Sequence, residues 1–307
     1  MFSKRHRPSS AEFLPVFPAG AAIPRIIHQT HADAHDSLPF ILEENVRRIK
    51  ALNPGWEHRL YDDEDIAEFI GSTYGLRVLN YYQRLNVKYG AARADLFRYL
   101  LLYKHGGVYL DIKASLEKPL DSVLLADDVY LLSRWRNRKG EEFEGWGLHD
   151  RLRDSGRQEF QQWHIIAASG HPFLRAVIER VLHNIDSYSP AFDDTGRSGV
   201  LHLTGPIAYT LAITPLLNQY KHRLVGSHDE LGLVYSVFTS AVWEAHKSAF
   251  KYHYTDLTEP VVKVDGIKKL LWQLIGPVQI HVIHRIQHLM DAIARRLQRR
   301  RDSRRRA

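Results

Sequence analysis

An arginine and two aspartates near a glycine pair form the most chemically suggestive group in the sequence. Asp95 and Arg98 are three residues apart in a stretch with helical spacing, so they share one helix face. Gly106 and Gly107 end this stretch, and Asp111 follows after a short apolar run that predicts a strand. Since ligands of open α/β sheets bind at the carboxyl ends of the strands, Asp111 is expected at such a crevice.

These residue types suit the binding of a sugar diphosphate. A departing nucleoside diphosphate gains negative charge in the transition state, and a cation or metal ion must stabilise that charge. Carboxylates such as those of Asp95 and Asp111 hold a divalent ion or accept hydrogen bonds from sugar hydroxyls. From the residues alone an alternative stays open, in which Asp95 and Arg98 form a surface ion pair and Asp111 caps a turn.

Strands and helices alternate along most of the chain, which predicts an α/β fold with a largely parallel sheet. Asp62 or Asp63 is expected to cap one of the helices. Residues 193–199 are interpreted as a Gly/Ser-rich loop, either solvated or in contact with an acceptor. Strands are predicted at 23–28, 56–61, 108–112, 128–134 and 163–168, and helices at 37–52, 64–70, 90–104, 173–184 and 205–217.

Composition narrows the class of protein. The 307 residues suit one large domain with appendages, and the absence of cysteine excludes disulfides, thiolate metal sites and cysteine nucleophiles. Residues 291–307 hold eight arginines and two aspartates, which accounts for +6 of the net charge of +7. The rest of the chain is close to neutral, so we expect no nucleic-acid partner.

The C-terminal part combines an apolar stripe with this basic tail. Apolar residues recur at helical spacing over 267–297, interrupted by Pro277. They indicate either a terminal helix packed on the body or a helix lying on an anionic membrane, where each arginine near the surface gains about 1 kcal/mol. No apolar run reaches the roughly 20 residues that span a bilayer. We therefore expect a cytoplasmic protein, with peripheral attachment to the inner face of the membrane as a further hypothesis.

Several motifs, in their order and spacing, resemble glycosyltransferase family 32, whose sugar-binding region carries a DXD motif. The family includes fungal mannosyltransferases, inositol-phosphoceramide mannosyltransferases and bacterial capsule or lipopolysaccharide enzymes. The resemblance extends over about residues 23–215. Its motifs are IPRIIHQT at 23–30, NPGW at 53–56, LYDD at 60–63, ARADLFRY at 92–99, GGVYLD at 106–111 and LTGP at 203–206.

The resemblance implies a GT-A fold, with a mostly parallel central sheet flanked by helices. Together with the composition of both ends, it suggests a flexible segment 1–22, a catalytic domain 23–257 and a C-terminal amphipathic segment 258–307 with the basic tail. It also implies transfer of a hexose, with retention, from a nucleotide-diphosphate sugar to a glycan or lipid-linked acceptor in surface polysaccharide synthesis.

Individual roles follow from the resemblance as well. Asp95 and Asp111 match catalytic positions, Arg98 a donor sugar and phosphate contact, and Tyr109 a neighbour of the ribose or base. The loop after the first strand matches the wall of the base pocket. The donor-binding residues implied in this way are His28, Gln29, Thr30, His31, Asp95, Arg98, Tyr109, Asp111 and Lys113.

The sequence departs from the family pattern at Lys113, where the second acid of the DXD pair is expected. An ammonium group cannot ligate a divalent cation. One interpretation keeps Mn²⁺ or Mg²⁺, held by Asp111 and a C-terminal residue such as His246. In a second, Lys113 itself neutralises the diphosphate. In a third, the chain is a non-catalytic domain that binds a nucleotide sugar or a glycan.

Tryptophans are candidates for the acceptor side. Trp146 lies in a Gly-flanked polar stretch and is our first choice for stacking on a sugar ring, with Trp135 and Trp163 as alternatives. His164, by contrast, lies in an apolar run and is expected to be a core histidine.

Overall fold

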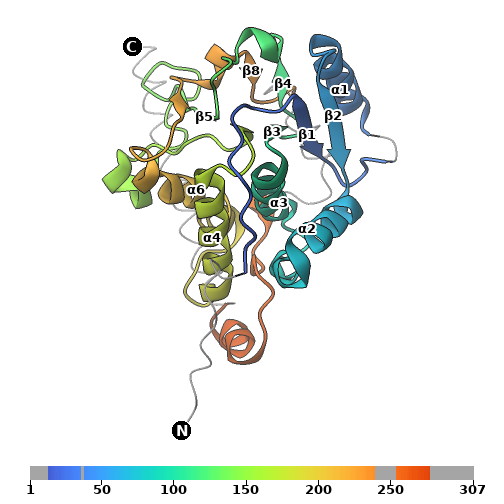
Figure 1. Ribbon diagram of the computed structural model, residues 1–307. Helices are drawn as coiled ribbons and strands as arrows, with labels where there is room; N and C mark the ends of the chain where they lie inside the picture. The colour runs from blue at the N-terminus through green and yellow to red at the C-terminus, as the bar shows by residue number, and fades with distance from the viewer. Residues whose placement is uncertain (1–12, 36–37, 239–253, 277–307) are drawn as a thin grey trace, which may run out of the picture.

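The computed structural model describes residues 13–35, 38–238 and 254–276. Its centre is a six-stranded sheet with the order β2-β1-β3-β6-β5-β7 (Figure 1). Only β6 runs opposite to the other strands of this sheet. The predicted α/β class with a mostly parallel sheet is therefore confirmed. The strands are β1 Ile26–Thr30, β2 Glu57–Tyr61, β3 Gly107–Leu110, β5 Tyr130–Leu132, β6 His164–Ala167 and β7 Arg223–Leu224, and a separate pair joins β4 Ser115–Leu116 to β8 Leu233–Val234.

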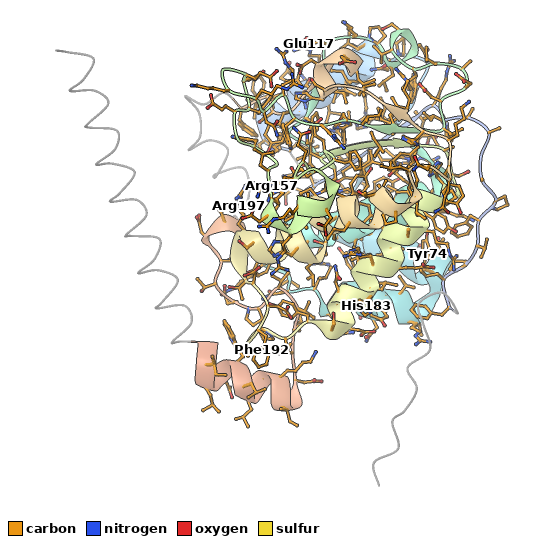
Figure 2. The ribbon with its side chains drawn as sticks, turned by 90° about the vertical axis from the view of Figure 1, so that its left-hand side faces the viewer. Tyr74, Glu117, Arg157, His183, Phe192 and Arg197 are labelled. Carbon is orange, nitrogen blue, oxygen red and sulfur yellow. The ribbon has the colours of Figure 1, made fainter. Side chains whose placement is uncertain are left out.

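Helices flank this sheet, and α2, α3 and α4 lie next to one another (Figure 1). The α-helices are α1 Phe40–Leu52, α2 Asp63–Arg84, α3 Gly90–His105, α4 Pro172–Ser187, α5 Gly196–Leu203 and α6 Pro206–Ile213. The 3-10 turns are η2 Leu120–Ser122, η3 Asp150–Ser155, η4 Thr214–Leu216, η5 His228–Leu231 and η7 Tyr254–Asp256. Residues 266–276 are also helical and lie at the lower edge of the body (Figure 2).

The sheet is apolar on both faces because successive side chains of a strand point to opposite sides. Tyr109 of β3 and Ile165 of β6 belong to one core, which they share with α2, α3, α4 and α6. Val108 and Ile166 belong to a second core, together with Ile49 of α1 and residues of β4 and β8. Burial on both faces is the usual state of parallel strands.

Helix α3 lies inside the protein rather than on its surface. Every residue from Asp95 to Tyr103 is buried, so the helix has no solvated face along this stretch. A helix buried on all sides is a core element, and a charged residue inside it needs a partner. Two such residues, Asp95 and Arg98, are the ones selected from the sequence.

Helix α2 is longer than the predicted 64–70. It runs to Arg84, with an interruption at Gly75, whose φ is 79°. The cap is Asp62: its side chain accepts the backbone N–H groups of Glu64 and Asp65, and the Asp65 carboxylate accepts the N–H of Asp62 in return. This reciprocal arrangement is a capping box.

The interpretation of residues 193–199 as a loop is wrong from Gly196 onward. The chain forms α5 there because Val200 and Leu203 pack into the main core, and this burial outweighs the low helix propensity of the glycines and serine. Helix 205–217 is shorter than expected, since α6 gives way to η4 at Thr214.

The segments that precede β1 and follow η7 also pack against the main core. Residues 13–22 were expected to be loosely ordered, but Leu14 is 4% exposed and the Phe17 ring lies 5.3 Å from the ring of Tyr103. Val261 and Val262 are buried in the same core.

Residues 1–12 and 277–307, with most of the stripe and the basic tail, lie outside the described residues. Within the described part, none of the helices combines the length and the hydropathy needed to cross a membrane.

Gly107 connects α3 to β3 where the main chain passes very close to β1. Its φ is 101°, and an added Cβ would lie 2.6 Å from the carbonyl oxygen of Ile26. We expect Gly107→Ala to lower the free energy of unfolding, measured with urea, by about 2–4 kcal/mol, because it adds a backbone clash to the unfavourable φ. Gly140→Ala is the control: its φ is 86° with no atom within 4 Å, so only the backbone cost of about 1–2 kcal/mol is expected. Equal losses in the two variants would show that the close approach is unimportant.

Candidate active site

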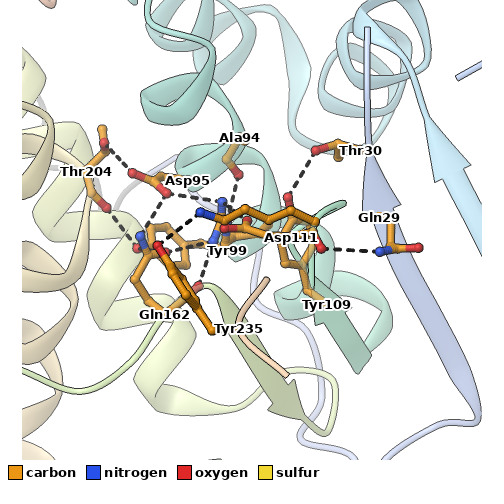
Figure 3. Close-up of polar contacts among 12 residues, drawn as sticks. Gln29, Thr30, Ala94, Asp95, Tyr99, Tyr109, Asp111, Gln162, Thr204 and Tyr235 are labelled. Atoms are coloured by element: carbon orange, nitrogen blue, oxygen red, sulfur yellow. Dashed lines mark hydrogen bonds and ion pairs between the residues drawn. The ribbon is translucent and has the colours of Figure 1, made fainter. Parts of the chain in front are cut away.

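Arg98 joins the two aspartates selected from the sequence (Figure 3). Its Nη2 atom lies 3.3 Å from Oδ1 of Asp95 and 2.9 Å from Oδ1 of Asp111. Helix α3 presents Asp95 and Arg98 one turn apart, and Asp111 directly follows β3. The alternative of a surface ion pair is wrong, since Asp95 is 2% and Arg98 3% exposed.

The remaining donors of Arg98 are also occupied. Nη1 donates to the backbone oxygen of Gln162 at 2.6 Å and to its Oε1 at 3.1 Å, and Nε donates to the backbone oxygen of Ala94 at 3.3 Å. The guanidinium carbon lies 4.5 Å from the centre of the Tyr109 ring. Burial lowers the pKa of Arg98, but the negative charge of Asp111 and the other neighbours more than offset this and raise it overall. Arg98 is therefore a permanent buried cation.

Asp95 lies beneath the accessible surface. Its Oδ1 accepts from Nε2 of Gln162 at 3.0 Å and its Oδ2 from Oγ1 of Thr204 at 2.9 Å. Burial raises the pKa of this carboxyl, whereas the charge of Arg98 and the two hydrogen bonds act in the opposite direction. Among the described residues Asp95 thus has partners on both oxygens, and its place in the structure is that of a support for Arg98.

Asp111 is the acid of the group that reaches solvent. Its side chain is 26% exposed, against 3% for Asp95. The main chain at this position is held on both sides: the N–H of Asp111 donates to the Trp163 oxygen at 2.8 Å, and Nε2 of Gln29 donates to the Asp111 oxygen at 3.3 Å. The carboxylate is therefore fixed at the mouth of the site, with the Arg98 charge directly behind it.

The predicted wall of the base pocket is mostly interior. His28 is fully buried, with Nε2 3.1 Å from the Gly106 oxygen and Nδ1 3.0 Å from the Tyr61 hydroxyl. Burial lowers the pKa of His28 to about 3, so the ring is neutral, donates through Nε2 and accepts at Nδ1. His28 therefore supports the sheet, and its assignment to a pocket wall is wrong because β1 is a central strand covered on both faces.

The other residues implied for donor binding differ in accessibility. Gln29 is fully buried and supports Asp111, and Tyr109 is fully buried beneath Arg98. The Tyr109 hydroxyl shares a hydrogen bond of 3.0 Å with the half-buried Thr30. The ring of His31 accepts the N–H of Asp33 at 3.1 Å. Direct contact with a donor is open to Thr30 and Asp111, whereas the side chain of His31 is 6% exposed, and Gln29 and Tyr109 act through their neighbours.

Lys113 lies in the turn after β3 and points to Tyr235. Its Nζ donates to the Tyr235 hydroxyl at 3.0 Å and lies 4.3 Å from the centre of that ring. Tyr235 also contacts Trp146 edge-on, with the ring centres 5.8 Å apart. It therefore connects the charged group to an aromatic cluster formed by Trp135, Phe143, Trp146, Trp163, His228 and Tyr235.

Within this aromatic cluster, Trp146 is the exposed member, at 48%. Trp135 and Trp163 are 8% and 5% exposed and support it from inside. The structure thus places the first choice for sugar stacking at the surface, beside Tyr235. His164, as expected, is a core histidine: it is 3% exposed, and burial lowers its pKa.

Three contributors to the site went unnoticed in the sequence. Gln162 and Tyr235 belong to no motif, so no sequence signal pointed to them. Thr204 lies in the LTGP motif, which marked its position but gave no role. All three lie more than 45 residues from Asp111 along the chain.

Metal ligands are sparse around Asp111. Among the residues that the structure describes, one group of three potential ligands lies close together, His35, Asp62 and Asp65, and its two acids already form the cap of α2. Asp111 belongs to no such group. His246, proposed from the sequence as a second ligand, lies outside the described residues.

Residues 39–130, which include Asp95, Arg98 and Asp111, match the family described as glycosyltransferase sugar-binding region containing DXD motif. The resemblance noted in the sequence is confirmed over residues 39–130, which match the model of that glycosyltransferase family.

Several curated relatives are named as mannosyltransferases of yeasts. Inositol phosphoceramide mannosyltransferase 3 of Schizosaccharomyces pombe is 36% identical over 104 residues, which is 34% of this chain and 28% of the relative. The initiation-specific alpha-1,6-mannosyltransferase of the same yeast is 28% identical over 216 residues, which is 66% of this chain and 50% of the relative. Mannosyl phosphorylinositol ceramide synthase SUR1 of Saccharomyces cerevisiae is 36% identical over 107 residues, or 35% and 27% of the two chains. The matches thus span between about a quarter and a half of these relatives.

Two solved glycosyltransferase domains align with most of this chain at low sequence identity. PaToxG glycosyltransferase aligns with 84% of this chain and 88% of its own, at 15% identity and a TM-score of 0.46. The UDP-bound glycosyltransferase domain of the YGT toxin aligns with 82% and 89%, at 9% identity and a TM-score of 0.44.

The buried pair of Asp95 and Arg98 should contribute strongly to stability. We expect Asp95→Ala to lower the free energy of unfolding by about 3–5 kcal/mol, because it removes a partner from a buried cation and frees Gln162 and Thr204. Asp127→Ala is a matched control, since Asp127 is 73% exposed and lies 2.8 Å from the likewise exposed Lys221 in a surface pair. Its loss should stay below about 1 kcal/mol. Similar losses for the two variants in urea denaturation would contradict the assigned role of Asp95.

Proposed function

We propose that the protein transfers a hexose from a nucleotide-diphosphate sugar to a glycan or glycolipid acceptor. The observation that carries the proposal is the ion pair between Arg98 and Asp111 at the carboxyl end of β3, within the family's sugar-binding region. The crevice at this edge is where ligands of such sheets bind.

The charges match the needs of the reaction. The bond that breaks leaves a nucleoside diphosphate with increased negative charge, and a preorganised cation lowers the energy of that state. Arg98 is fixed in place by its hydrogen bonds before any substrate arrives. Asp111, half-exposed in front of it, offers a carboxylate to the hydroxyls of the donor sugar. Retention of configuration and a role in surface polysaccharide assembly are parts of the proposal that rest on the family resemblance.

The acceptor belongs on the side of Trp146. An exposed indole next to Tyr235 offers a flat apolar surface of the type that lines ligand sites. Two of the relatives are named for mannosyl transfer to inositol phosphoceramide, a glycolipid precursor. By analogy with those names we extend a mannose-type sugar and a lipid-linked acceptor to this chain.

Replacing Asp111 tests the proposed reaction. In assays with UDP- and GDP-sugars, including GDP-mannose, we expect the wild-type chain to release nucleoside diphosphate and Asp111→Asn to lower kcat/KM by about 100-fold or more. Asp127→Asn is the control, because Asp127 is 73% exposed and pairs with Lys221 at the surface. Donor binding without turnover by the wild-type chain would instead support a non-catalytic sugar-nucleotide-binding domain.

We further propose that the enzyme works at an anionic membrane surface, docked through helix 266–276. Lys268 holds this helix on the body by donating to the backbone oxygens of Asp186 and Tyr188 at the C-terminal end of α4. The opposite face is apolar and exposed: Ile267 is 77%, Leu270 56% and Leu274 67% exposed.

Charge favours a lipid surface as the partner of this face. Residues 291–307, which follow in the sequence, carry eight arginines, and each basic residue near an anionic surface gains about 1 kcal/mol. An apolar helix face combined with basic residues is typical of helices that lie in the membrane interface.

Vesicle flotation tests the docking surface. We expect the full chain to float with vesicles containing phosphatidylglycerol, and the triple variant Ile267→Ser, Leu270→Ser, Leu274→Ser to lose most of this binding. The control exchanges three equally exposed residues elsewhere, Leu76, Val87 and Leu125, for serine. Equal flotation of both triple variants, or none for the wild-type chain, would contradict the proposal.

A further inference from the structure

We infer that Lys113 neutralises the diphosphate of the donor, with the buried charge of Arg98 behind Asp111, and that the site needs no divalent metal ion. The inference rests on the proposed function and concerns the same site. A DXD-type site implies a bound metal ion. Whether the residues around Asp111 can ligate such an ion therefore decides between a metal and Lys113.

The residues around Asp111 do not fit a divalent cation. Mg²⁺ and Mn²⁺ prefer several oxygen ligands, usually including more than one carboxylate. Among the described residues, Asp111 is the exposed acid of this group, and its Oδ1 already takes the Arg98 guanidinium at 2.9 Å. Asp95 is buried and its oxygens are engaged by Arg98, Gln162 and Thr204. A metal ion bound here would have to share the Asp111 carboxylate with Arg98, and it would be repelled by the positive charges of Arg98 and Lys113.

Hydrogen bonds from several parts of the chain fix the main chain around Lys113. The N–H of Ala114 donates to the Asp111 oxygen at 2.8 Å and closes the turn that contains Lys113. Asn45, which is 4% exposed, donates from Nδ2 to the oxygens of Ile112 and Ala114 at 3.2 and 2.7 Å. The N–H of Val237 donates to the Lys113 oxygen at 2.8 Å. The main chain of Lys113 is therefore fixed two residues beyond Asp111.

Its side chain is placed for an anion. Tyr235 accepts one N–H of the ammonium at 3.0 Å, and an ammonium has three. The Tyr235 ring beneath it also stabilises the positive charge. Lys113 thus supplies a positive charge two residues beyond Asp111, while the charge of Arg98 is shared by the carboxylates of Asp95 and Asp111. Lysine is an established phosphate ligand that acts as a point charge.

Calorimetric titration of the full chain with UDP and with GDP, in EDTA and in Mn²⁺, tests the inference. We expect the preferred nucleotide to bind with the same affinity, within about threefold, under both conditions. Lys113→Ala should weaken binding about tenfold or more in either buffer. Lys113→Asp restores a second acid and should bind poorly in EDTA but recover in Mn²⁺. Lys139→Asp, an exchange at an exposed lysine, is the control and should bind like the wild-type chain.

The possible failures are distinguishable. Binding by the wild-type chain that appears only with Mn²⁺ would overturn the inference and leave the proposed function intact, and its loss in His246→Ala would then identify a metal ligand. Unchanged binding by both Lys113 variants would equally overturn the inference. If neither nucleotide binds under any condition, the proposed function itself fails.

Discussion

The site depends on one buried cation. Arg98 lies inside helix α3 at 3% exposure, where an unpaired guanidinium would be very costly. Its partners come from separate parts of the chain: Asp95 from the preceding turn of α3, Asp111 from the end of β3 and Gln162 from the segment before β6. Because the charge must be satisfied, these contacts hold the three segments together at Arg98. That arrangement leaves Asp111 at the surface with a fixed positive charge behind it.

The alternation of side chains along β3 determines which residues face Arg98. Tyr109 points from β3 toward α3 and supports Arg98, while Val108 and Leu110 point into the opposite core. The glycines before β3 allow the chain to turn directly from the buried helix into the central strand. The distance between Asp95 and Asp111 is therefore set by the core, and substrate binding does not have to create it.

The sequence predicted the structure correctly where the residues of the site and the residues that form the helix and the strand lie close together along the chain. The spacing of Asp95 and Arg98, the glycine pair and the strand before Asp111 predicted both the elements and their meeting point. His28 and Gln29 were expected to line a pocket but are buried, because their partners Tyr61, Gly106 and Asp111 come from other parts of the chain and only the fold brings them together. Helix α5 was missed for the same reason: Gly196 and Ser198 favour a loop locally, and the packing of Val200 and Leu203 decides otherwise. Tyr235, more than a hundred residues from Lys113, could be connected to it only through the fold.

The central claim is that the Arg98–Asp111 pair marks the diphosphate site, with Lys113 beside it. A crystal structure of the chain with its preferred nucleoside diphosphate tests this most directly. The account predicts diphosphate oxygens within hydrogen-bonding distance of Lys113 and next to the Arg98–Asp111 pair, with the aromatic cluster left open to the acceptor. A diphosphate bound instead in the cavity of about 410 Å³ lined by Arg134, Arg136 and Arg138 would contradict it.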